Sequence, residues 1–440
     1  MVNEDLTLRG RIVTGSLAFD DGVIAVAGDR ISYVGPASAF PGIADLEQNR
    51  PAGDGRYTLL PGLVDLHCHG AAGSDFSEGS AAAARSAARF LHRRGTTTLL
   101  ASLVTASTPD LLRNLNALRP VAEEGLIAGS HLEGPFLSPH HHGAHDPALL
   151  RDPDPVLMSE LLAAAGTSLV SLTCAAELPG AQQLVDQLTA SGVVPSLGHT
   201  AADTATAAGF LGRAALGLQQ AGHRQGNPVP RRPTVTHLFN AMPTLHHRSP
   251  GPVAASLSEA HAGRAVIELI ADGVHLAADT VRMVFDLVGA DNIALVTDSM
   301  AATGLQDGRY RLGNLAVTVH EGVARLDSTG AIAGGTATLL DVVRAAVAAG
   351  VSLQDAVRSA SAVPASVLGL SGHVGDLHKG MRADIVVVDS ELALAGVMRH
   401  GRWIEPLPRR SPAALEVREG QEAAGSADEL GGEPMLARDV

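Results

Sequence analysis

The middle of the chain alternates between short apolar segments and Ala-rich segments that are compatible with helices. The apolar segments recur eight times, at residues 59–66, 96–103, 126–130, 169–173, 193–197, 234–236, 265–271 and 292–297. Helix-compatible segments such as 80–94 lie between most of them, and another, 339–349, follows the last. Strands that alternate with helices form βα units around a parallel sheet. Eight such units predict an α/β protein with a TIM-like (β/α)8 barrel over residues 59–379.

The two ends of the chain have a different pattern. Residues 11–15 and 28–36 are short apolar runs bounded by turn residues, as in antiparallel strands, and a similar segment lies at 383–389. We therefore predict a small β-sandwich domain formed from both ends, residues 1–58 plus 380–405. Residues 406–440 are rich in Pro, Gly, Ala and Glu, and we predict a disordered acidic tail there.

Composition narrows the class of protein. Apolar residues make up 45% of the chain and charged residues 18%, which suits a soluble globular protein with a large core. The net charge of −14 argues against an extended DNA- or RNA-binding surface, because phosphate backbones require Lys and Arg. We find no signal peptide and no run of about 20 apolar residues, so no membrane span is predicted. Only Cys68 and Cys174 are present, which favours a reducing cytoplasm.

Histidine and carboxylate side chains follow the C-terminal ends of the predicted strands. These residues are His67, His69, Glu133, His199, His237, His275 and Asp298. In a barrel, the C-terminal strand ends converge on one mouth. Imidazole nitrogen and carboxylate oxygen are the ligands that Zn²⁺ and Fe²⁺ favour, with one position left open for water. The pattern predicts a divalent metal site with an Asp available as a base.

Each of these residues also has a structural explanation when it is taken alone. His199 could be a satisfied core histidine, and Asp298 could cap a helix N-terminus. Glu133 could bind backbone amides at a strand-to-loop junction, and the His67–His69 pair could be structural. These structural explanations account poorly for the presence of all of these residues at strand ends.

Two segments are more specific than the strand-end pattern. They are His-Leu-Glu-Gly-Pro at 131–135 and His-Leu-Phe-Asn-Ala-Met at 237–242, with further matching segments at 60–70, 143–145, 197–200, 272–275, 296–298 and 380–384. On these segments the chain resembles the N-acetylglucosamine-6-phosphate deacetylase family of the amidohydrolase superfamily. The resemblance implies hydrolysis of the acetamide of N-acetyl-D-glucosamine 6-phosphate to D-glucosamine 6-phosphate and acetate, in amino-sugar recycling.

The resemblance also implies a set of metal ligands. Glu133, His199 and His237 would hold the catalytic divalent ion, with Zn²⁺ favoured over Fe²⁺, Co²⁺ or Mn²⁺. Some members of the family lack the His-x-His motif that His67 and His69 form here. The chain could therefore bind one ion or two per subunit.

The remaining implied roles concern catalysis and substrate. Asp298 would deprotonate the attacking water and then protonate the leaving amine, because an amide leaves poorly unless its nitrogen is protonated. His145 would help to polarise the acetyl carbonyl. Arg248 and His275 would meet the sugar phosphate from a second subunit, which implies a homodimer with shared active sites. The other implied substrate-binding residues are Ala144, Asn240, Ala241, Ile332, Ala333 and Gly334.

Three features depart from the family pattern. His140, His141 and His142 stand where the lid segment of relatives often carries Lys or Arg, and Gly335 replaces an expected Ser. Residues 221–232 are predicted to form a surface loop that is longer than in relatives. None of these changes removes a residue that the chemistry needs.

Two alternative functions stay open from the sequence. A different amidohydrolase, such as a dihydroorotase-like cyclic amidase or a deaminase, would share the metal site but not residues 240–242 and Arg248. A dihydroorotase also usually needs a carboxylated Lys; the only lysine, Lys379, follows no predicted strand, although Glu133 can bridge instead. The second alternative is an inactive barrel that serves as a binding module, which would be expected to have lost metal ligands.

Overall fold

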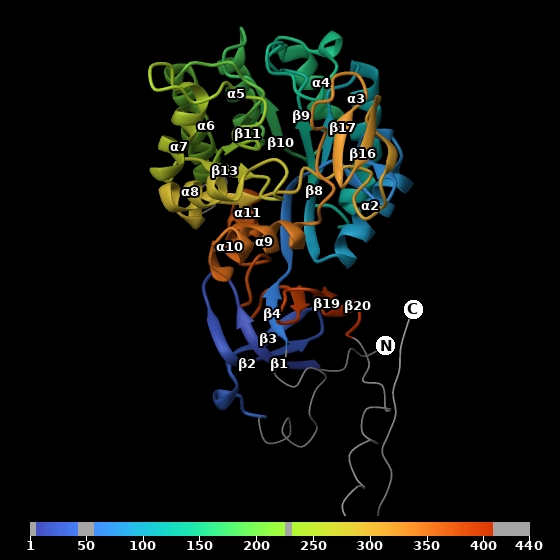
Figure 1. The fold of residues 1–440 in the computed structure, drawn as a ribbon, viewed down its shortest axis with the longest axis vertical. Helices are drawn as coiled ribbons and strands as arrows, with labels where there is room; N and C mark the ends of the chain where they lie inside the picture. Colours follow the sequence, from blue (N-terminus) through green and yellow to red (C-terminus); the bar gives the residue numbers. More distant parts are fainter. Residues whose placement is uncertain (1–5, 43–56, 225–230, 408–440) are drawn as a thin grey trace, which may run out of the picture. The chain divides into compact units, whose positions relative to one another are not determined.

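A parallel barrel forms the centre of the computed structural model, which describes residues 6–42, 57–224 and 231–407. Neighbouring strands pair in parallel and in chain order (Figure 1). A parallel bridge between Cys68 and Ser299 closes the ring, and the Asp298 amide donates to the His67 carbonyl at 2.9 Å. The predicted (β/α)8 barrel is therefore confirmed. Its strands are β5 (Leu63–Cys68), β8 (Thr96–Val104), β9 (Gly129–Glu133), β10 (Leu169–Cys174), β11 (Val194–Leu197), β12 (Thr234–Val235), β13 (Val266–Leu269) and β14 (Ile293–Leu295).

The third barrel strand lies three residues later than its sequence pattern predicts. The prediction placed it at 126–130, whereas β9 spans Gly129–Glu133. Leu126 donates its amide to the Val121 carbonyl at the end of a helix, and Ile127 is buried in the main core. These apolar residues pack the end of that helix instead of starting the strand.

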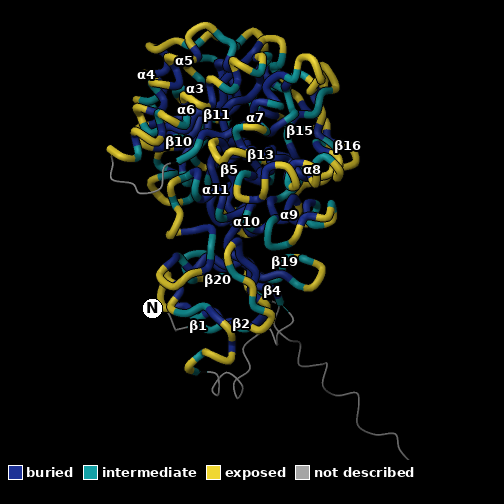
Figure 2. The backbone as a smooth tube through the Cα atoms, turned by 90° about the vertical axis from the view of Figure 1, so that its left-hand side faces the viewer, coloured by how far each residue is buried: buried dark blue, intermediate teal, exposed yellow. Residues whose placement is uncertain are grey.

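The helices pack their apolar faces against the barrel, whose strands are buried while exposed positions gather on helices and loops (Figure 2). In the predicted helix at 80–94, Ser80 caps the N-terminus and Ala84, Ala87, Ala88 and Leu91 form one buried face. The helices are α2 (Ala81–Arg93), α3 (Thr108–Glu123), α4 (Pro155–Ala165), α5 (Ala181–Ala190), α6 (Thr204–Arg224), α7 (Gly251–His261), α8 (Ala278–Val288), α9 (Leu339–Ala348), α10 (Leu353–Ala360) and α11 (Ala362–Val367).

Strands from both ends of the chain form a second, seven-stranded sheet with its own apolar cluster, as predicted. In its centre, β4 pairs in antiparallel register with β18, joining the N-terminal strands to the C-terminal ones. β4 crosses the predicted boundary at residue 58, and the domain boundaries themselves stay a prediction. The strands are β1 (Leu6–Val13), β2 (Ala18–Ala27), β3 (Arg30–Pro36), β4 (Thr58–Pro61), β18 (Ile385–Val388), β19 (Leu394–Arg399) and β20 (Arg402–Glu405).

A three-stranded antiparallel sheet, which the sequence did not predict, lies between β14 and α9 in the chain. We call residues 308–326 the cap sheet; its strands are β15 (Gly308–Leu312), β16 (Leu315–His320) and β17 (Val323–Leu326). Its buried face packs against Val104 at the end of β8 and against Met300 and Ala333. The cap sheet therefore reaches the mouth of the barrel.

Two predicted irregular segments fall partly outside the described residues. The tail is predicted at residues 406–440, and all of these except 406 and 407 lie outside the described residues. In the loop prediction for 221–232, residues 221–224 instead complete α6, because Ala221 continues the buried face of Leu218 and Ala214. In the part of the chain that is described, none of the helices has the length and apolarity needed to cross a bilayer.

Candidate active site

Four imidazole rings surround the carboxylate of Glu133 at the mouth of the barrel. Its Oε1 atom lies 2.9 Å from His237 Nε2 and 3.0 Å from His199 Nε2. Its Oε2 atom lies 3.2 Å from the Nε2 atoms of His69 and His145. Each of these residues comes from a strand end or from the segment that follows β9, so the barrel brings them together. Glu133 thus offers one oxygen to each of two groups of histidines.

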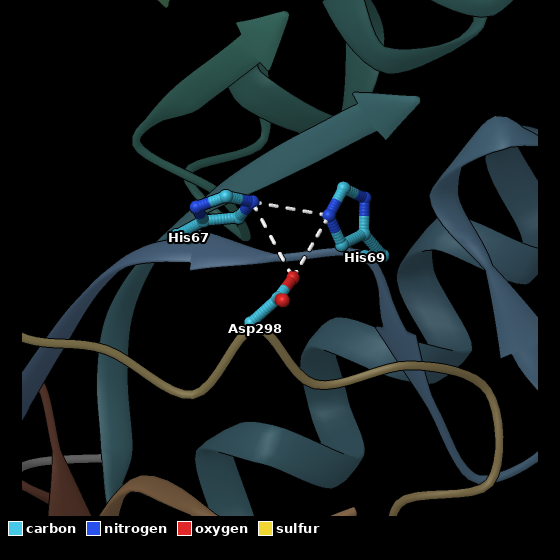
Figure 3. A group of neighbouring side chains, drawn as sticks. All are labelled: His67, His69 and Asp298. Carbon is cyan, nitrogen blue, oxygen red and sulfur yellow. Dashed lines mark hydrogen bonds and ion pairs between the residues drawn. The ribbon is translucent and has the colours of Figure 1, made fainter. Parts of the chain in front are cut away.

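A further cluster, which shares His69 with those around Glu133, consists of His67, His69 and Asp298 (Figure 3). The two Nε2 atoms are 3.1 Å apart. Asp298 Oδ1 lies 3.1 Å from His69 Nε2 and 3.5 Å from His67 Nε2. Figure 3 shows both rings turning these nitrogens toward one carboxylate oxygen. The ligand atoms of the three side chains therefore face one common point, where an ion could bind.

Hydrogen bonds at the far side of two of the four rings, His199 and His145, indicate which ring nitrogen carries the proton. His199 Nδ1 donates to the His141 carbonyl at 2.9 Å, so its Nε2 lone pair faces Glu133 and His237. His145 is opposite, because its Nδ1 accepts the Thr105 amide at 3.3 Å. The proton of His145 is therefore on Nε2, which makes it a donor into the site and not a metal ligand.

The donor set fits a divalent cation. The Nε2 atoms of His199 and His237 are 3.1 Å apart, as are those of His67 and His69. Two imidazole nitrogens at this separation cannot both present lone pairs or both present protons without repulsion, and a metal cation bound between the two lone pairs removes it. Imidazole and carboxylate ligands in this number are those of Zn²⁺ and related ions.

Charge within the site points the same way. Burial alone would lower the pKa of His69, but the carboxylates of Asp298 and Glu133 raise it to about 9. Burial alone would raise the pKa of Glu133, but His67 and His145 bring it well below its usual range. The pKa of Asp298 is also lowered against the effect of burial, by His67 and His69. Both carboxylates are therefore negative at neutral pH and stabilise positive charge among them.

The backbone at several of these residues is strained. His199, His237 and Asp298 have φ values of 49°, 27° and 48°, and Ala241 has 51°. This left-handed region costs a non-glycine residue about 1–2 kcal/mol. Such residues persist where the surrounding structure holds them, and they cluster at functional sites.

A cavity of about 220 Å³ opens onto these groups. Nearly all of the predicted site residues line it. They are His69, Glu133, Ala144, His145, His199, His237, Asn240, Ala241, His275, Asp298, Ile332 and Gly334.

Three predicted site residues are placed differently. His67 is fully buried, with its Nε2 facing His69, and Ala333 is buried in the cluster beneath the cap sheet. Arg248 is exposed and does not line the cavity of its own chain. All three sit outside the cavity wall, although His67 still contacts the site from behind it.

His275 departs from the expectation that it reaches in from a second subunit. It lines the cavity of its own chain, because β13 ends at Leu269 and the following turn brings it to the mouth. Its Nδ1 atom bonds to Asp272 Oδ2 at 2.8 Å. Burial opposes a raised pKa at His275, but the Asp272 carboxylate raises it.

Sequence reasoning missed Leu312, Ala331 and Gly143 in the cavity wall and Glu268 behind it. A Cβ atom at Gly143 would lie 3.0 Å from His199 Cε1, so the segment after β9 fits closely against that ring. The alternation in Leu-Ala-Val-Thr-Val-His at 315–320 was the one signal for the cap sheet. Nothing in the sequence pattern connects Glu268 with His67.

Comparison with known proteins agrees with this geometry. A profile of the amidohydrolase family matches residues 58–404. An N-acetylgalactosamine-6-phosphate deacetylase of Escherichia coli O157:H7 is 33% identical over 78% of this chain and 87% of its own length. An N-acetylglucosamine-6-phosphate deacetylase of Lysinibacillus sphaericus is 34% identical over 80% of this chain and 86% of its own.

A solved structure extends the agreement to the fold. It is a mutant N-acetyl-D-glucosamine-6-phosphate deacetylase from Mycobacterium smegmatis in complex with N-acetyl-D-glucosamine-6-phosphate. It is 38% identical, with a TM-score of 0.81, and covers 91% of this chain and 100% of that one. The chain therefore belongs to the amidohydrolase family, and within it to the N-acetylglucosamine-6-phosphate deacetylases.

Proposed function

We propose that this chain hydrolyses the acetamide of N-acetyl-D-glucosamine 6-phosphate, giving D-glucosamine 6-phosphate and acetate in amino-sugar metabolism. The observation that carries the proposal is the meeting of four imidazole Nε2 atoms on Glu133, with Asp298 in the same cavity. The choice of substrate is supported by the relatives described above, which are named as deacetylases of N-acetylated amino-sugar 6-phosphates.

Glu133, His199 and His237 would hold one divalent ion, and His67 and His69 with Asp298 would offer a place for a second. The nitrogen and oxygen donors favour Zn²⁺, and they also suit Fe²⁺, Co²⁺ or Mn²⁺. A bound ion of this kind polarises a carbonyl and lowers the pKa of a coordinated water to about 7.

The side chains of the cavity divide the remaining work. Asp298 accepts the proton of the attacking water and returns it to the amide nitrogen, so that the amine leaves as a neutral group. His145 donates a hydrogen bond from Nε2–H to the acetyl oxygen as negative charge develops there, and keeps its proton. The tautomer of His145, set by the Thr105 amide, supports this role.

The phosphate is bound away from the reacting end. Asn240, Ala241 and His275 line the cavity, and we assign them with Arg248 to the sugar phosphate. Arg248 is exposed in its own chain, which supports a homodimer in which it reaches the partner's cavity. Both cysteines are free and buried thiols, in keeping with a cytoplasmic enzyme.

The test is acetate release from N-acetylglucosamine 6-phosphate, with and without added Zn²⁺, beside unphosphorylated N-acetylglucosamine. N-acetylgalactosamine 6-phosphate belongs in the same assay, because one of the relatives is named for that epimer. We expect release from a phosphorylated sugar and far less from the unphosphorylated one. Folded, metal-loaded protein that releases acetate from none of them would point to another amidohydrolase substrate.

A further inference from the structure

A buried carboxylate holds the first turn of the cap sheet, in addition to the apolar packing beneath the sheet. Asp75, which is 4% exposed, accepts the Gly313 amide at 2.7 Å on Oδ2. Its other oxygen accepts the Ser77 amide at 2.7 Å. Gly313 begins the two-residue turn between β15 and β16, and a Cβ atom there would lie 2.6 Å from Val104 Cγ2. The turn is therefore held closely against the end of β8.

This anchor places Leu312 in the wall of the cavity. Leu312 directly precedes the turn, is 3% exposed and lines the cavity. It packs in one apolar cluster with Val104 and Met300. Val104 directly precedes Thr105, whose amide sets the proton of His145, and Met300 lies two residues after Asp298. Leu312 thus lines the same cavity as the two groups assigned to the acetamide.

The wall of the cavity has a polar part and an apolar part. Glu133, His145 and Asp298 face the reacting amide, and the apolar part of the wall comes from Leu312, Ala331 and Ile332 together with Ala144 and Ala241. The other four of these apolar residues are partly exposed, whereas Leu312 is buried. When the carbonyl oxygen of an N-acyl group faces His145, its alkyl end needs an apolar surface, and Leu312 is the most deeply placed one.

We propose that Leu312 sets the upper limit on the length of the acyl chain that the enzyme removes. The proposal rests on the proposed function, because it concerns the acyl end of that substrate. The acetyl methyl group packs against the leucine side chain, and each further methylene of a longer acyl chain collides with it. Apolar pockets discriminate a single methylene by roughly 10- to 200-fold in kcat/KM.

The experiment compares N-acetyl- and N-butyrylglucosamine 6-phosphate as substrates, with release of the free amine as the readout. In Leu312→Ala we expect the ratio of kcat/KM for butyryl over acetyl to rise by at least about 10-fold. Leu312→Val removes one carbon and should raise the ratio less. It also keeps the test open if the alanine variant does not fold. Leu312→Met conserves volume and should keep the wild-type ratio.

The matched control is Leu326→Ala. Leu326 is buried in the same cluster beneath the cap sheet but does not line the cavity. If Leu326→Ala raises the ratio as much as Leu312→Ala, general loosening of the cap sheet explains the effect and the proposal fails. A wild-type ratio in both Leu312→Ala and Leu312→Val, with acetyl turnover retained, overturns it as well. Wild-type protein that releases no acetate refutes the proposed function itself, which is a separate result.

Discussion

Replacing Glu268 with Gln tests whether the histidine behind the cavity binds metal. Glu268 lies on β13 and is 3% exposed, and its Oε2 atom is 3.4 Å from His67 Nδ1. This contact orients the ring so that Nε2 faces His69 and Asp298. A carboxylate partner also makes the opposite ring nitrogen a stronger metal ligand.

The magnitude follows from the change of acceptor. Gln has the same shape as Glu, but its neutral side-chain oxygen accepts the hydrogen bond from His67 Nδ1–H in place of a charged carboxylate. A hydrogen bond to a charged partner contributes about 1.5–3 kcal/mol, and a neutral one about 1 kcal/mol. The difference of about 1 kcal/mol corresponds to a Kd for Zn²⁺ about fivefold weaker at the site that includes His67. Glu268→Ala removes the acceptor entirely and should weaken binding by about 10- to 100-fold.

The assay is a competition titration of Zn²⁺ against a chromophoric chelator, which resolves a first and a second equivalent. We expect weaker Zn²⁺ binding only for the equivalent whose site includes His67. Glu160→Gln, on the exposed face of α4, is the matched control and should leave both Kd values unchanged. If Glu268→Gln binds every equivalent as tightly as wild type, then Glu268 does not orient a metal ligand.

Further predictions address the assigned roles. Asp298→Asn should retain metal at Glu133 while acetate release falls by about 10²- to 10⁴-fold, and appreciable residual turnover would remove Asp298 as the base. His199→Ala should reduce the metal content of purified protein by one ion per subunit, measured by elemental analysis; unchanged content would take His199 off the ligand set. Arg248→Ala should harm turnover of the phosphorylated sugar far more than of unphosphorylated N-acetylglucosamine. Equal losses on both substrates would mean that Arg248 is structural.

The barrel could be predicted because its strands are apolar runs that end on polar residues. That pattern found the segments that carry His67, Glu133, His199, His237 and Asp298. It misplaced the third strand, since apolar residues at the end of α3 continue the same run. A single sequence does not distinguish apolar residues that finish a helix from those that begin a strand.

The cap sheet and the orientation of the rings could not be predicted in the same way. Leu312 reaches the cavity through a bond between Asp75 and Gly313, which are 238 residues apart. The tautomers of His199 and His145 depend on the His141 carbonyl and the Thr105 amide. These contacts come from packing between segments far apart in the chain, and their residue types carry no local pattern.

The sheet built from both ends of the chain also sets the order of events during translation. Thr58 in β4 pairs with Val388 in β18, roughly 330 residues later. At about 5–20 residues per second, the ribosome needs on the order of 20–60 s to supply that partner. Until then one edge of β4 has unpaired amides and carbonyls while the barrel is being made. A nascent chain that stops before Ile385 therefore keeps an unpaired strand edge that can pair with other chains, and this edge is where we expect chaperones to bind.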